Sequence, residues 1–154
     1  FSDGFDSDFS NGSVRRSVFK NIGGDALDFS GSKVFIKGTD ILNVHDKAVS
    51  VGEASNVRIE GGRIDNVGVA IASKDGSSTS ATKVEIGNYT LHTAMTYVKK
   101  HFYGEPTLEM TGCLVNGIAS YSRQKGTLLV VDGIPVPEKD VNVNTLYEVG
   151  VMKK

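Results

Sequence analysis

Apolar and polar residues alternate with a period of two along short stretches of this chain. Leu27 and Phe29 mark one such stretch, and Val34 and Ile36 mark the next. A period of two places the apolar side chains on one face of a β-strand and the polar ones on the other. The longer period of an amphipathic helix is absent almost everywhere. The pattern therefore predicts an all-β protein built from many short strands.

Blocks of sequence also return at a nearly constant spacing. Asp8–Val14 resembles Asp28–Val34 at a shift of 20 residues, and Ser32–Ile36 resembles Ser55–Ile59 at a shift of 23 residues. Separate blocks agree on a period of about 22 residues. Such a period indicates a solenoid, in which each coil covers the apolar face of its neighbours.

Aligning the repeats predicts which residues stack in the core. Each predicted column holds aliphatic or aromatic residues from equivalent positions of successive coils. The columns are Leu27, Val49 and Val69; Phe29, Val51 and Ile71; Val34, Val57, Val84 and Leu108; and Ile36, Ile59, Ile86 and Met110. One coil cannot bury its inward side chains alone, so we expect the columns to form one continuous core.

An asparagine recurs at one corner of the repeat, at Asn21, Asn43 and Asn66. Asn tolerates left-handed backbone angles in turns, and stacked amides can bond one another along the axis. Together with the aliphatic columns and Gly-rich corners, this asparagine column resembles the right-handed parallel β-helix of the pectin-lyase-like superfamily. The resemblance covers about Asp3 to Val115 and implies a right-handed parallel β-helix (solenoid) of about five coils.

Two parts of the chain depart from the repeat. Asp75–Thr82, rich in Ser and Thr, is predicted to be an extended loop at a coil corner. Near the C-terminus the repeat fades, and Thr127–Val131 with Val141–Val143 predict a β-hairpin or cap over the last coil. We therefore expect a β-helix over residues 1–123 and a C-terminal hairpin or cap over residues 124–154.

Composition and charge narrow the range of partners. The chain has 154 residues, of which 39% are hydrophobic and 23% charged, as in an ordinary folded domain. Its net charge of -1 gives no general attraction to nucleic acid or to an anionic membrane surface. No apolar run reaches the roughly 18 residues of a membrane span. Neither nucleic-acid binding nor membrane insertion is expected.

Other sequence features exclude several kinds of chemistry. The single Cys113 rules out an internal disulfide, and its surroundings predict a strand thiol. The glycine pairs fall at coil corners, so no nucleotide-binding loop is predicted. The three His residues show no ligand spacing, and no metal ligands are assigned. Because the chain starts at Phe1 and its first Met is Met95, we expect the natural N-terminus to lie outside this sequence.

Asp28, Ser50 and Ala70 lie between apolar positions of one strand column and are predicted to point outward. They begin a polar stripe on the outer face of the sheet that, in the resembling superfamily, commonly lines the substrate groove. Carboxylates, ammonium groups and hydroxyls in one row can bind sugar hydroxyls, carboxylates or a hard cation. The assigned catalytic residues are Asp28, Lys74 and Lys99, and the assigned substrate-binding residues are Ser50, Glu53, Asp75, Lys100 and His101.

Three functions remain open for this stripe. In a hydrolase, Asp28 with Asp25 or Asp46 would act as acid and base on a glycosidic bond. In a lyase, Lys74 or Lys99 would remove the proton next to a uronate carboxylate while Asp residues hold Ca²⁺, the one cofactor considered. In the third case the stripe is a noncatalytic surface for glycan binding or for another contact.

The leading hypothesis is a β-helical domain of a secreted or cell-surface protein that interacts with polysaccharide as part of a larger carbohydrate-active protein. Enzymatic activity stays open, and a polysaccharide lyase or a glycoside hydrolase would be the expected class. The alternative is a noncatalytic structural β-helix that acts as a spacer, assembly or oligomerisation module, since this architecture hosts many unrelated functions. A homo-oligomer and a larger parent chain both remain open.

Overall fold

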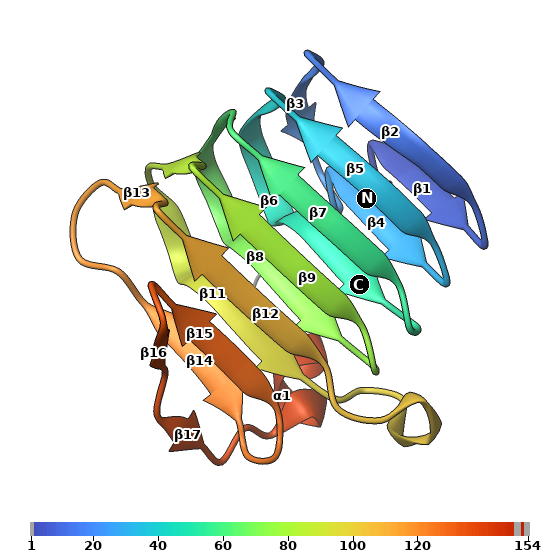
Figure 1. Cartoon of the computed structure of the whole chain (residues 1–154), viewed down its shortest axis with the longest axis vertical. Helices are drawn as coiled ribbons and strands as arrows, with labels where there is room; N and C mark the ends of the chain where they lie inside the picture. Colours follow the sequence, from blue (N-terminus) through green and yellow to red (C-terminus); the bar gives the residue numbers. More distant parts are fainter. Residues whose placement is uncertain (1, 150–151, 153–154) are drawn as a thin grey trace.

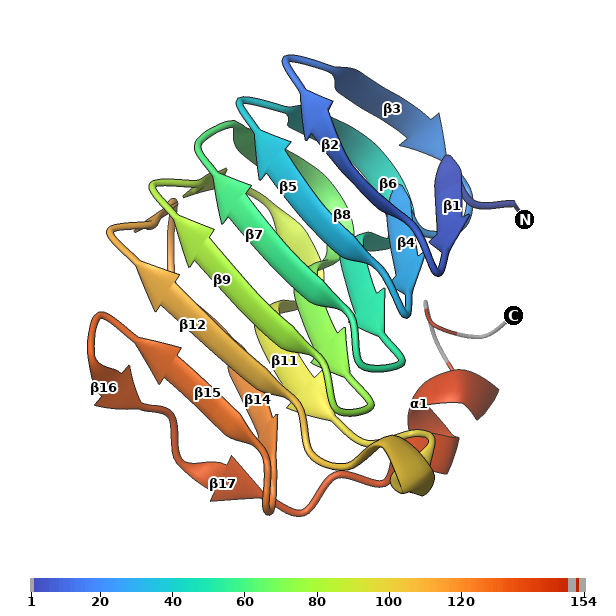
Figure 2. The same cartoon turned by 45° about the vertical axis from the view of Figure 1, so that its right-hand side comes forward.

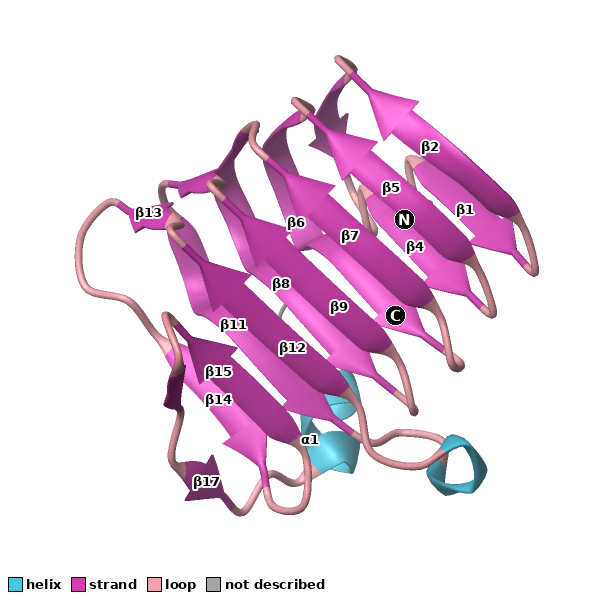
Figure 3. Cartoon of the chain, in the orientation of Figure 1, coloured by secondary structure: helices cyan, strands magenta, loops and turns pink. Residues whose placement is uncertain are grey.

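The computed structural model describes residues 2–149 and 152, which wind into a parallel β-solenoid of about six coils (Figure 1). Strands dominate the described chain, and helix occurs in it only at η1 (His101–Tyr103) and α1 (Val143–Glu148) (Figure 3). The predicted all-β parallel solenoid is confirmed, with about one coil more than expected.

Each coil contributes strands to two stacked sheets, which we call sheet A and sheet B. The strands of sheet A follow one another in the order β1 (Phe5–Asp8), β4 (Leu27–Ser30), β6 (Asp40–Gly52), β8 (Arg63–Lys74), β11 (Tyr89–Tyr97), β14 (Tyr121–Gln124) and β17 (Glu138–Lys139). Three further strands belong to this sheet, β3 (Val18–Ile22), β10 (Glu85–Ile86) and β13 (Leu114–Val115). β3 pairs with the first part of β6, β10 pairs with the first part of β8, and β13 pairs with β10. We call this part of sheet A its bent extension.

Sheet B lies opposite sheet A, across the core. Its strands are β2 (Asn11–Arg15), β5 (Lys33–Lys37), β7 (Asn56–Glu60), β9 (Ser78–Thr82), β12 (Thr107–Thr111), β15 (Leu128–Val131) and β16 (Ile134–Pro135). Strands β2 to β15 pair in parallel, whereas β16 folds back antiparallel on β15. This short hairpin ends sheet B, and its first strand is the expected one, but its second strand is Ile134–Pro135 rather than the predicted Val141–Val143. The sixth coil, formed by β14 and β15, crosses the expected boundary between residues 123 and 124.

The first coils stack as the alternation predicts. Leu27 pairs with Val49 in sheet A, and Val34 pairs with Val57 in sheet B. All four side chains are buried in one apolar cluster that fills the solenoid. Burial of this kind, about 25 cal/mol for each Å² of apolar surface, is the main force holding the coils together.

The predicted register is wrong in the fourth coil. Val49 pairs with Ile71 rather than Val69, and Val51 pairs with Ser73. Because residues 69–72 are all small or aliphatic, a slip of two positions leaves the apolar pattern unchanged, and the sequence alone could not exclude it. Val69 instead belongs to a second apolar cluster, which lies outside the main core.

The extended loop predicted at Asp75–Thr82 is also wrong. Ser78–Thr82 forms strand β9, which pairs with both neighbouring coils. Its inward positions are Thr79 and Ala81, where the alignment expects Val84 and Ile86. Small and polar residues at inward positions hid this strand from a search for aliphatic alternation. The longer excursion lies between β11 and β12 and contains η1.

The asparagine column is confirmed. Asn43 Nδ2 donates a hydrogen bond to Asn21 Oδ1 at 3.1 Å, and Asn66 Nδ2 donates to Asn43 Oδ1 at 2.9 Å. All three residues have positive φ, between 56° and 60°, which Asn tolerates better than most residues. The three side chains are exposed, so the amide column lies on the outer surface of the corner.

Candidate functional site

The predicted polar stripe lies on the outer face of sheet A, away from the core. Asp28 pairs with Ser50, and Ser50 pairs with Ala72, so these three positions form an outward row across three coils. Ala70, which was expected in this row, is part of the main core instead. The row continues through Met95 and Ser122 of the next strands.

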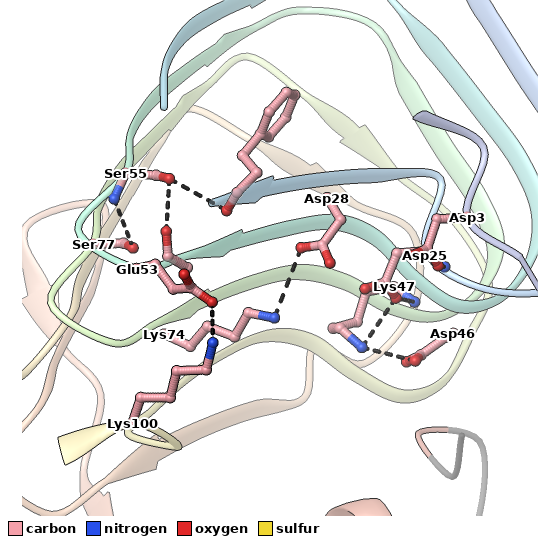
Figure 4. Close-up of polar contacts among 12 residues, drawn as sticks. Asp3, Asp25, Asp28, Asp46, Lys47, Glu53, Ser55, Lys74, Ser77 and Lys100 are labelled. Atoms are coloured by element: carbon pink, nitrogen blue, oxygen red, sulfur yellow. Dashed lines mark hydrogen bonds and ion pairs between the residues drawn. The ribbon is translucent and has the colours of Figure 1, made fainter. Parts of the chain in front are cut away.

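Asp28 and Lys74, both assigned catalytic roles, meet on this face (Figure 4). Lys74 Nζ lies 3.7 Å from Asp28 Oδ1, and the two side chains are only 13% and 14% exposed. Gly52 makes this possible, because a Cβ atom at that position would lie 2.8 Å from Lys74 Cε. Ser50 is fully buried beside Asp28, and its hydroxyl has no hydrogen-bond partner among the described residues.

A second ion pair lies at the adjoining corner, between Glu53 and Lys100 (Figure 4). The hydrogen bond from the Lys100 ammonium lowers the pKa of the Glu53 carboxyl, with a smaller contribution from the Tyr103 hydroxyl. Tyr103 Oη donates to Glu53 Oε2 at 3.3 Å. The structure thus brings together Glu53 and Lys100, as expected of a shared site.

The remaining predicted residues are not part of one site. Asp75 is buried, and its carboxylate accepts hydrogen bonds from the backbone N–H groups of Lys99 and Lys100, both at 2.6 Å. It therefore orders the start of the β11–β12 connection. Lys99 Nζ lies 4.0 Å from the centre of the Tyr147 ring in α1. His101 is exposed in η1.

A buried ionic cluster of Asp25, Asp46 and Lys47 lies next to the stripe (Figure 4). Lys47 Nζ is 3.0 Å from Asp25 Oδ1 and 2.8 Å from Asp46 Oδ2, close enough for ion pairs, although the angles do not make these contacts hydrogen bonds. Each side chain is at most 5% exposed. The sequence named Asp25 and Asp46 only as acid–base partners of Asp28. It could not predict the burial of the cluster, because Lys47 lies near Tyr147 of α1, a contact that no repeat encodes.

Burial and the ion pairs have opposite effects on the pKa of Asp46 and on the pKa of Lys47. It raises the pKa of Asp46 to about 6, despite the opposing attraction of Lys47. Burial also opposes the charge on Lys47, but the attraction of Asp25 and Asp46 exceeds it and raises the Lys47 pKa. One oxygen of each carboxylate, Asp25 Oδ2 and Asp46 Oδ1, has no hydrogen-bond partner among the described residues.

Stability should therefore fall as the pH rises through the titration of Asp46. The folded protein binds this proton more tightly than the unfolded chain, whose Asp pKa is about 3.8. The contribution of Asp46 to the free energy of unfolding should decrease by about 2 kcal/mol between pH 4 and pH 7. Urea denaturation at a series of pH values, compared with the Asp46→Asn variant, measures it. Equal pH profiles for the two proteins would contradict the buried placement of Asp46.

Helix α1, seen beside sheet A in Figure 2, and Met152 pack on the outer face of β8 and β11. Met152 is fully buried in the second apolar cluster, with Val69, Met95 and Tyr97 of sheet A. Helix α1 packs beside them, and the hydroxyls of Tyr97 and Tyr147 lie 2.6 Å apart. The strand predicted at 141–143 is wrong, because Val143 begins α1 with Asn142 as its N-cap. The stripe is thus largely closed to a polymer.

The outer face of sheet B is open, and no described element lies in front of it (Figure 2). A groove of about 490 Å³ follows its first three coils. The residues that line it are Asn11, Gly12, Lys33, Val34, Phe35, Asn56 and Arg58. The Phe35 ring is flanked by guanidinium groups of the neighbouring coils, with Arg15 Cζ 5.0 Å and Arg58 Cζ 5.5 Å from the ring centre.

Among the described residues, no three His, Cys, Asp or Glu side chains are grouped in a way that could hold a metal ion. Neither η1 nor α1, the helices of the described chain, is long and apolar enough to cross a membrane. Comparison with curated proteins and with solved structures gave no significant match. A family model described as the right handed beta helix region matches residues 3–133, most of the chain. With this match and the parallel solenoid of its strands, the chain belongs to the right-handed β-helix family.

Proposed function

We propose that this β-helix binds an acidic polysaccharide through the outer face of sheet B. The observation that carries the proposal is the open groove in which Arg15 and Arg58 flank the Phe35 ring. The proposal keeps the predicted class of ligand but moves the contact from sheet A, where the C-terminal segment covers the face, to sheet B.

The charges on this part of sheet B favour a polyanion. Arg15, Lys33, Lys37 and Arg58 point outward from three neighbouring strands, and Glu60 is the acidic residue among them. Glu60 forms two ion pairs, with Oε1 3.0 Å from Lys37 Nζ and Oε2 3.4 Å from an Arg58 Nη. Four cations against one anion leave three positive charges for a ligand.

The arrangement of the guanidinium groups suits carboxylates on a sugar chain. Stacking on Phe35 limits the orientations of Arg15 and Arg58. Arg15 Nε donates to Ser13 Oγ at 3.2 Å, and an Arg58 Nη donates to Glu60 Oε2 at 3.4 Å. Each guanidinium therefore keeps further N–H groups for a ligand. A guanidinium can bind one carboxylate through two parallel hydrogen bonds. The exposed amides of Asn11 and Asn56 on the same face can bind neighbouring hydroxyls.

Calorimetric titration with polygalacturonate tests the proposal, with methyl-esterified polygalacturonate as the uncharged polymer of the same backbone. We expect the acidic polymer to bind more tightly and its affinity to fall as salt is added. Replacing Arg58 with Gln should raise the Kd about tenfold, since a charge-assisted hydrogen bond contributes about 1.5 kcal/mol. Lys125→Gln, a charge-matched change at an exposed site in the turn between β14 and β15, should have no effect.

Equal affinity for the acidic and the esterified polymer, or an unchanged Kd for Arg58→Gln, would refute the proposed site. The same incubations can be assayed for new reducing ends and for unsaturated uronates. They thereby test whether the protein cleaves the polymer, whereas the roles assigned to Asp28, Lys74 and Lys99 stay predictions. Secretion, surface location and a larger parent protein also stay predictions.

A further inference from the structure

A second open groove runs along the solenoid axis at the corner that carries the asparagine column. It has a volume of about 420 Å³ and touches four successive coils. The residues that line it are Ile22, Asn43, Val44, His45, Asn66, Val67, Gly68 and Thr90. Neighbouring parallel strands lie about 4.8 Å apart, so the groove offers a similar polar group at regular steps of this length.

The backbone keeps this corner concave. Positive φ angles at Asn43 and Asn66 turn the chain from the bent extension into the main part of sheet A. Gly68 follows that bend and lies against the preceding coil, where a Cβ atom would come within 2.5 Å of the Asp46 carbonyl oxygen. A larger residue would force the coils apart at the floor of the groove.

The stacked amides retain hydrogen-bonding capacity for a ligand. An Asn side chain has two N–H donors and an oxygen with two lone pairs. Within the column, Asn43 uses one N–H to bind Asn21 and accepts one hydrogen bond from Asn66. One donor and one acceptor position of the exposed Asn43 amide are therefore left for groups in the groove, and the exposed Thr90 hydroxyl adds another.

The remaining lining residues favour an uncharged ligand. No Asp, Glu, Lys or Arg occurs among the described residues that line this groove. Val44 and Val67 are largely buried and form an aliphatic floor between the polar groups. An aliphatic floor with a few convergent polar groups is typical of binding sites for small organic molecules. Sugar rings match it, because they combine C–H faces with hydroxyls that both donate and accept.

We infer that the asparagine-column groove is a second binding site, which takes a short stretch of a neutral, linear glycan lying parallel to the solenoid axis. The site is separate from the cationic groove of sheet B and shares no lining residue with it. It does not depend on the proposed binding of acidic polysaccharide.

Titration of the isotopically labelled protein with soluble β-linked oligosaccharides of glucose, mannose and xylose, followed by nuclear magnetic resonance, tests the inference. We expect at least one oligosaccharide to shift the signals of Asn43, Asn66 and Thr90. The variant carrying Asn43→Gly and Asn66→Gly should bind that sugar about tenfold more weakly, because two hydrogen-bonding amides are lost. Glycine keeps the positive φ at both positions.

Two further variants separate the outcomes. Lys83→Gly, a glycine replacement at another residue with positive φ, φ 54°, should bind as the wild type does. Thr90→Val, which keeps the side-chain shape, should weaken binding even if the double variant does not fold. The inference is overturned if no oligosaccharide shifts the groove signals, or if Thr90→Val and the folded double variant bind normally. Arg58→Gln should leave neutral-sugar binding unchanged, so failure of the sheet B proposal is distinguishable.

Discussion

Replacing Val51 with Asp is expected to abolish folding. Val51 is fully buried in sheet A, where it pairs with Phe29 of one neighbouring coil and Ser73 of the other. A carboxylate there would face the apolar core without a cationic partner, which costs more than about 4 kcal/mol and rivals the total stability of a small domain. Far-UV circular dichroism and urea denaturation of the purified variant measure the loss.

Ser78→Asp is the matched control, because it introduces the same carboxylate on a neighbouring coil. Ser78 is exposed on the outer face of β9, so the change should alter the free energy of unfolding by no more than about 0.5 kcal/mol. A folded Val51→Asp protein, with a denaturation midpoint like that of Ser78→Asp, would mean that the register between β6 and its neighbours is wrong.

Replacing Lys47 with Ala should lower the free energy of unfolding by about 3 to 5 kcal/mol. The change leaves Asp25 and Asp46 buried without their shared cation, and both already have an oxygen without a hydrogen-bond partner among the described residues. The loss of packing against α1 adds to this, since Lys47 Nζ lies 5.9 Å from the centre of the Tyr147 ring. Urea denaturation at pH 7 measures the effect.

Lys37 supplies a control at nearly the same ion-pair geometry. Its ammonium lies 3.0 Å from Glu60 Oε1, as Lys47 lies 3.0 Å from Asp25 Oδ1, but its side chain is 51% exposed. Lys37→Ala should therefore cost at most about 1 kcal/mol. Equal costs for the two alanine variants would show that the Lys47 cluster is not buried. Combining Lys47→Met with Asp25→Asn and Asp46→Asn should recover much of the loss, because no unpaired charge remains.

The alternation and the repeat were sufficient to predict the solenoid and the stacking of its early coils. They succeeded where inward aliphatic residues alternate with outward polar ones, as around Val34 and Val57, because only one register then buries the apolar face. They failed at Thr79 and Ala81, whose small side chains still fill an inward position once neighbouring coils supply the larger ones. The alternation within one strand does not show that larger residues of neighbouring coils fill the space beside Thr79 and Ala81.

The candidate site shows a similar division. Asp28, Lys74, Glu53 and Lys100 were predicted to belong to one stripe, because residues at equivalent repeat positions stack. The structure pairs Asp28 with Lys74 and Glu53 with Lys100. The covering of this face could not be predicted, because α1 and Met152 contact it through a fold-back that no repeat encodes. The sheet B groove was missed, because the stacking of Arg15, Phe35 and Arg58 appears only when three coils are in register.

The parallel pairing of successive coils also determines how the domain responds to force. Hydrogen bonds between coils, such as those joining β5 to β7, run along the solenoid axis. A pull along the axis therefore opens one coil interface at a time, whereas a pull across the axis acts on the two stacked sheets together. The strands of sheet B lie across the axis. A polymer bound to sheet B and pulled along these strands would therefore apply its force across the axis, the direction in which the two sheets resist together.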